Sequence, residues 1–114
     1  MTFREFAAAA EEIWAGLPAP LLDDLPGGLV VLPAARAIPG RRGLVALGEY
    51  QRGPAGNRIV LYHGSFARVL SGRGAAAWRE QLQRTIGHEL RHHMEARAGR
   101  ADLARAEERE RGES

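Results

Sequence analysis

The apolar residues near the start of the chain repeat at helical spacing. They are Phe3, Phe6, Ala10, Ile13, Trp14 and Leu17. Residues spaced three and four apart lie on one side of a helix, so this stripe would face a core. Thr2 precedes the stripe and Glu5 follows three residues later, which is the spacing of a capping box. The pattern predicts a helix over Phe3–Gly16, followed by a linking turn at Pro18–Pro20.

Three short apolar segments in the middle of the chain are typical of strands. Leu29–Leu32 is a continuous apolar run, and Arg58–His63 is rich in β-branched and aromatic residues. Gly43–Gln51 is a third predicted strand, separated from the last one by turn residues. Ser65 is expected to cap a short helix over Phe66–Leu70. This stretch predicts a small sheet of about three strands.

A long helical pattern begins near Ala75 and ends near Ala98. Its apolar residues step by four: Trp78, Leu82, Ile86, Leu90 and Met94. Gly99 stands where a glycine commonly ends a helix. The Arg/Glu-rich remainder, Arg100–Ser114, predicts one more short helix and then a frayed tail from about residue 105. The fold class expected from these elements is α+β.

Composition limits what such a chain does. A length of 114 residues is enough for a single domain with a small core. The absence of cysteine excludes disulfides, thiol catalysis and cysteine-based zinc sites. No apolar run is long enough to span a bilayer and the N-terminus is a poor secretory signal, so we expect no membrane partner and a cytoplasmic protein.

The high pI is a weak argument for nucleic-acid binding. All 16 basic residues are arginine, but the net charge is only +2. With no lysine to titrate, this small excess gives a pI near 9.9. The arginines are spread along the chain and no recognition motif accompanies them, so nucleic acid is not an expected partner.

The chemistry concentrates in the segment from His88 to His92, which reads His-Glu-x-x-His on the predicted helix. Residues four apart on a helix are neighbours, so His88 and His92 can hold one zinc ion. Glu89 is rotated off that face and remains beside the metal, where it can act as general base toward a water whose pKa the metal lowers. The alternative is a solvated helix face with no metal.

This motif resembles that of the minimal zincin-like bacterial metallopeptidases, which pair His-Glu-x-x-His-His with a short helix–strands–helix core. The resemblance extends to Leu47–Tyr50 and Ile59–Tyr62, which are similar to that family's strand pair. It implies a small zincin-like domain spanning 1–114, with an active-site helix, a zinc cofactor and a peptide or protein substrate.

The resemblance also implies a third zinc ligand. Compact members carry Gly-x-x-Asp soon after the second histidine, and Gly99–Asp102 has this pattern about one helical turn later. Asp102 is therefore the first candidate. The alternatives are Glu95, on the same helix face as the histidines, and the late pair Glu107 and Glu108.

Five further residues have weaker functional interpretations. His93 is rotated away from the ligands, which favours a packing role over ligation. Tyr50, Tyr62 and His63 are candidate transition-state donors, although each is also an ordinary strand residue. Gly48 with Tyr50 suggests an edge strand that binds extended peptide. The rival function is a non-catalytic module that uses the zincin scaffold to bind a metal and a protein or peptide.

Overall fold

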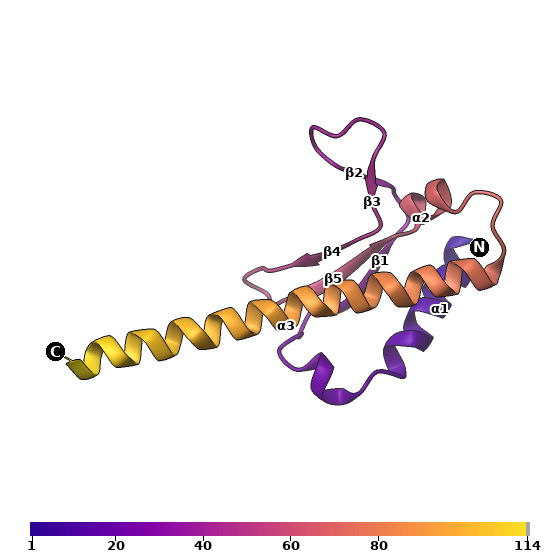
Figure 1. The fold of residues 1–114 in the computed structure, drawn as a ribbon. Coiled ribbons are helices and arrows are strands. Elements are labelled where there is room, and N and C mark those ends of the chain that lie inside the picture. The colour runs from indigo at the N-terminus through magenta and orange to yellow at the C-terminus, as the bar shows by residue number, and fades with distance from the viewer. Residues whose placement is uncertain (114) are drawn as a thin grey trace.

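The structure, a computed structural model, describes the backbone of residues 1–113 and the side chains of residues 1–100. The elements in chain order are α1 (Phe3–Ala15), the 3-10 turn η1 (Ala19–Leu22), β1 (Gly28–Leu32), β2 (Arg36–Ala37), β3 (Val45–Ala46), β4 (Gly48–Gln51), β5 (Arg58–Tyr62), α2 (His63–Val69) and α3 (Ala75–Glu113). Figure 1 shows α3 running along the small sheet with α1 beside it. The expected α+β class is confirmed.

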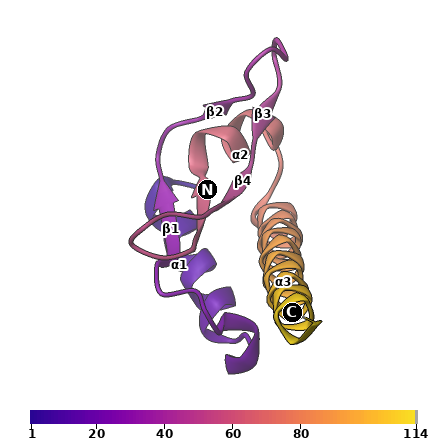
Figure 2. The same cartoon turned by 90° about the vertical axis from the view of Figure 1, so that its left-hand side faces the viewer.

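The main sheet has three strands in the order β1-β5-β4. β1 pairs with β5 in parallel, with Val30 opposite Val60, and β4 pairs with β5 antiparallel, with Glu49 opposite Val60. β4 is therefore an edge strand, and α3 packs beside it. β2 and β3 form a separate two-stranded ribbon that projects away from the body, as Figure 2 shows.

Two predicted elements in this region were wrong in detail. The expected strand Gly43–Gln51 is divided at Leu47, because β3 pairs with β2 whereas β4 pairs with β5. Ser65 does not cap a helix over Phe66–Leu70: it lies buried inside α2, which begins earlier, and its hydroxyl accepts a hydrogen bond from the backbone N–H of Arg36 at 2.9 Å. Both differences come from long-range pairing, which local patterns do not contain.

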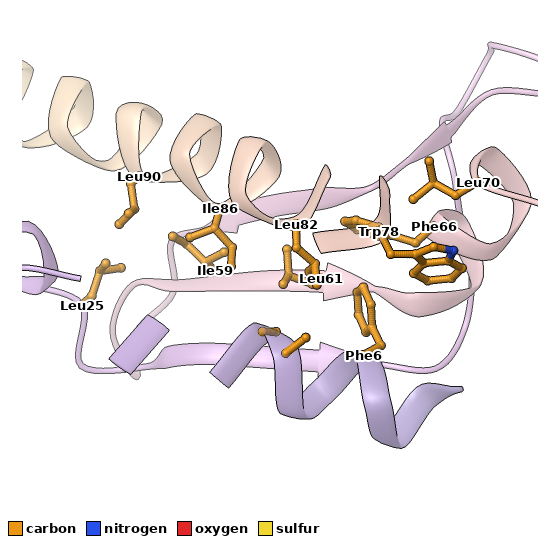
Figure 3. Close-up of a cluster of buried hydrophobic side chains, with 12 residues drawn as sticks. Phe6, Leu25, Ile59, Leu61, Phe66, Leu70, Trp78, Leu82, Ile86 and Leu90 are labelled. Atoms are coloured by element: carbon orange, nitrogen blue, oxygen red, sulfur yellow. The ribbon is translucent and has the colours of Figure 1, made fainter. Parts of the chain in front are cut away.

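The core lies between the sheet and the helices α1 and α3 (Figure 3). Phe6 of α1 meets the ring of Phe66 at a centroid distance of 4.8 Å and that of Trp78 at 6.0 Å, both edge to face. Ile59 and Leu61, which share one face of β5, complete this cluster. The capping box of Thr2 and Glu5 is also present, so the predicted start of α1 is confirmed.

The apolar stripe of α3 is confirmed at four of its five positions. Trp78, Leu82, Ile86 and Leu90 are buried, but Met94 is 43% exposed. Four residues advance about 400° around a helix, so a stripe with this spacing drifts by about 40° at each step. By Met94 the drift has carried the side chain out of the core, and its neighbour His93 is buried instead.

The long helix continues where the sequence predicted its end. α3 passes through Gly99 without a break and extends to Glu113, in place of the expected separate short helix and frayed tail. Asp102, Glu107 and Glu108 lie in the part of α3 whose side chains are outside the described residues. Among the residues that the structure describes, no helix is long and apolar enough to cross a membrane.

Candidate metal centre

Three side chains of α3 converge on one point beside β4. The ligand atoms of His88, Glu89 and His92 all lie within 4.8 Å of one another. The Nε2 atoms of His88 and His92 are 3.0 Å apart and share a hydrogen bond, so the two rings direct their nitrogens at each other. Two imidazole nitrogens on a tetrahedral zinc ion would be separated by about 3.3 Å, from Zn–N distances of about 2.05 Å. The histidine pair therefore fits zinc with little adjustment.

Glu89 is held differently from the two histidines. Its side chain turns toward the sheet and the residue is only 5% exposed, whereas His88 and His92 are exposed. Its Oε1 atom lies 3.8 Å from Nε2 of His92. Burial raises the pKa of the Glu89 carboxyl, although the charges of His92 and His88 oppose this shift. A carboxylate with a raised pKa, close to the metal position, is suited to take up a proton.

The packing of α3 explains why Glu89 is buried while His88 and His92 are exposed. Leu82, Ile86 and Leu90 fix the buried face of α3 on the core. Residues 88 and 92, four apart, then lie together at the rim of that face, while residue 89 is rotated about 100° inward. The local sequence therefore provides two exposed imidazoles and one buried carboxylate within about one turn of the helix.

Two adjoining cavities surround these side chains. The larger, of about 600 Å³, extends toward Arg84, Thr85 and Leu47. The smaller, of about 380 Å³, extends toward Tyr50 and Arg52. Both include Gly48, Glu89 and His92 in their walls. Together they form a cleft along β4 with the candidate metal centre in its middle.

Gly48 sets how closely the edge strand approaches α3. A Cβ atom on this residue would lie 3.0 Å from Cγ2 of Thr85 and 3.1 Å from Cδ2 of Leu61. Such contacts are tighter than ordinary van der Waals packing, so a larger residue would require β4 or the side chains of Thr85 and Leu61 to shift. The expectation that Gly48 and Tyr50 belong to an edge strand is confirmed.

His93 ties three separate segments together and takes no part in the cluster. It is fully buried, and its Nε2 lies 2.7 Å from the backbone carbonyl oxygen of Asp23 while its Nδ1 lies 2.9 Å from the Tyr50 hydroxyl. Because a carbonyl oxygen only accepts, Nε2 carries the proton and Nδ1 accepts from Tyr50 in the neutral ring. The packing role that the sequence favoured for His93 agrees with this geometry.

Within residues 1–100, the remaining residues that the sequence singled out lie outside the cluster of His88, Glu89 and His92. The Tyr50 hydroxyl is occupied by His93, Tyr62 is buried on β5, and His63 contacts the Met1 carbonyl oxygen at 2.9 Å. Glu95 is exposed and does not join the cluster of His88, Glu89 and His92. Since the side chains of Asp102, Glu107 and Glu108 are not described, the third ligand stays a prediction.

Two features of this site were not predicted from the sequence. The link between His93, Tyr50 and Asp23 has no local signal, because these residues are far apart in the chain. The sequence also did not lead us to Arg84 as a residue of the site, although Arg84 lies one helical turn before His88 and borders the larger cavity. Its spacing from the motif was the available signal, since residues four apart share a helix face.

Comparison with known proteins gives a family but no activity. No family model and no curated protein matches this chain. A solved structure described as a conserved hypothetical protein from Thermus thermophilus is 36% identical, with a TM-score of 0.78. The match covers 87% of this chain and 99% of that one. The chain therefore belongs to the same family as this conserved hypothetical protein.

Proposed function

We propose that this protein is a zinc-dependent peptidase in which His88 and His92 hold the metal and Glu89 is the general base. The observation that carries the proposal is the convergence of two imidazole nitrogens, 3.0 Å apart, with a buried carboxylate 3.8 Å from one of them. Two neutral nitrogens with an adjacent acid are the donor set that catalytic zinc uses. The third ligand is proposed to be Asp102, with Glu107, Glu108 and Glu95 as alternatives.

The chemistry divides between the metal and the chain. When bound, zinc lowers the pKa of water and polarises the carbonyl of the peptide bond. Glu89 takes the proton from the attacking water at its carboxylate and delivers it to the leaving amine. Its burial supports both steps, because the same desolvation that raises its pKa makes it a stronger base and keeps bulk water away.

β4 is suited to hold the substrate. It is the edge strand of the sheet and runs beside the cleft, so one side of its backbone has no strand partner within the part of the chain that the structure describes. An extended peptide can pair with such an edge through backbone hydrogen bonds. Gly48 is the first residue of this edge strand, and it lies with Glu89 and His92 in the walls of both cavities. A peptide bond placed there would lie beside the general base.

The test is Glu89→Gln, with zinc content and peptide turnover measured on the same preparation. Glutamine keeps the size of the side chain but cannot act as a base, so hydrolysis should fall by about 10²-fold or more while zinc binding is retained. Glu80→Gln is the matched control, because Glu80 is an exposed carboxylate on the same helix whose described contact is an ion pair with Arg84. Full activity of the Glu89 variant would remove this residue from the mechanism.

The alternative function is a non-catalytic module that holds a metal and binds a peptide. It is favoured by one observation: among the side chains of residues 1–100, only Glu89 joins His88 and His92 in the cluster, and Glu89 is the proposed base. A metal held by two histidines alone would leave the site suited to binding. Full zinc content with no turnover of a mixed peptide library would select this alternative.

A further inference from the structure

The charges around the cleft are unevenly distributed. Arg84 borders the larger cavity and Arg52 borders the smaller one, so each of the two cavities has a cation in its wall. Arg84 has an ion pair with Glu80 at 2.7 Å, but both side chains are largely exposed, at 70% and 63% respectively. An exposed pair of this kind contributes little free energy and does not prevent Arg84 from meeting a second carboxylate.

The carboxylates of the cleft are already engaged. Glu89 is the proposed general base and is buried. Glu49, in the wall of the smaller cavity, accepts hydrogen bonds from Arg36 at 2.8 Å and from Gln51 at 3.2 Å. Within residues 1–100, whose side chains are described, no ion pair involves Arg52. Among these described side chains, each cavity of the cleft therefore has one cation in its wall, and neither has an uncommitted acid.

We infer that the cleft selects extended peptides with acidic side chains on both sides of the bond that lies over Gly48. This inference rests on the proposed function, because it places the peptide along β4. A strand advances about 3.3 Å per residue, so side chains a few residues before and after the central bond reach the two cavities. Arg84 would meet an acidic side chain at one end and Arg52 at the other.

The test compares three labelled dodecapeptides of equal length that carry aspartate, asparagine or lysine at the positions flanking a common central segment. Binding to the zinc-loaded Glu89→Gln variant, which does not consume them, is measured by fluorescence anisotropy. The aspartate peptide should bind more tightly than the lysine peptide, by up to about fivefold for each of the two exposed ion pairs. The preference should diminish at high salt.

Charge reversal provides the decisive comparison. Arg84→Glu combined with Arg52→Glu should reverse the order of the three peptides. Arg79→Glu is the matched control, because Arg79 is on the same helix, pairs with Glu12 at 3.2 Å and does not border either cavity. It should leave the order unchanged.

Two outcomes overturn the inference. Equal affinities, or an order that the double charge reversal does not change, would refute the acidic preference. The proposed function is judged separately, by turnover of the asparagine peptide with the parent protein, and would stand if that peptide were cleaved. If no peptide is bound by the variant or cleaved by the parent protein, both the inference and the proposed peptidase fail.

Discussion

Replacing His93 with leucine tests whether this residue links separate segments of the fold through hydrogen bonds or acts as a metal ligand. Leucine keeps most of the buried volume but removes both hydrogen bonds, to the Tyr50 hydroxyl at 2.9 Å and to the Asp23 carbonyl oxygen at 2.7 Å. A polar group left unpaired in the interior costs about 1–3 kcal/mol. Tyr50 is half-buried and Asp23 is an exposed residue, so the lower part of that range applies to each. The expected total is about 2–4 kcal/mol.

Thermal unfolding followed by circular dichroism measures this loss. For a domain of this size, 1 kcal/mol corresponds to about 4 °C, so Tm should fall by about 8–16 °C. Tyr50→Phe should cost less, and a double-mutant cycle between the two positions should give a coupling of at least about 0.5 kcal/mol. Zinc content should stay that of the parent protein, because His88 and His92 are untouched.

His63→Leu is the matched control for this experiment. His63 also hydrogen-bonds a backbone carbonyl oxygen, that of Met1, but it packs against Phe6 and Trp78 at the other end of the core. It should lower Tm without any coupling to Tyr50. A His93→Leu variant that keeps its Tm but loses zinc would refute the assignment of His93 as a tie and make it a ligand.

Three further predictions concern the cleft and its protons. Gly48→Ala should cost about 1–3 kcal/mol of stability by overpacking. Adding Thr85→Ser should recover part of that loss, because it removes the Cγ2 atom next to residue 48. An unchanged Tm of the Gly48→Ala variant would contradict the close approach of β4 to α3. In the metal-free protein, burial raises the pKa of Glu89 above its unfolded value, so the free energy of unfolding should fall as pH rises between the two pKa values. Urea unfolding should therefore show that Glu89→Gln gains stability relative to the parent protein as pH rises. A difference in stability that does not change with pH would argue against the shift. Zinc affinity should be lower at about pH 5 than at pH 7.5, because only neutral imidazole binds the metal; equal affinities would contradict histidine ligation.

Much of the fold followed from local patterns. The capping box of Thr2 and Glu5, the β-branched run of β5 and the apolar stripe of α3 are short-range signals, and the structure contains all three. The positions that differed depend on distant partners. Ser65 is buried and bonds to the backbone of Arg36, 29 residues earlier in the chain. The predicted strand Gly43–Gln51 is divided because its two halves join different partners.

The candidate site also has one part that local sequence predicts and another that depends on distant contacts. The spacing of His88, Glu89 and His92 on one helix is local, so sequence was enough to predict their convergence. The cleft, in contrast, is formed by β4 and α3, whose contact depends on the absence of a side chain at Gly48. Arg52 and the hydrogen bonds of His93 have no sequence signature, because tertiary packing brings them to the cleft. Arg84 did have one, since it precedes His88 by four residues on the same helix.

The measurement that tests the central claim most directly is the zinc content of the parent protein and of a His88→Ala/His92→Ala double variant, by elemental analysis after purification without chelator. We expect close to one zinc ion per chain in the parent protein and none in the variant. Helix content should be unchanged, because alanine is a strong helix former and both histidines are exposed. Equal zinc content in the two proteins would contradict a metal centre on this helix.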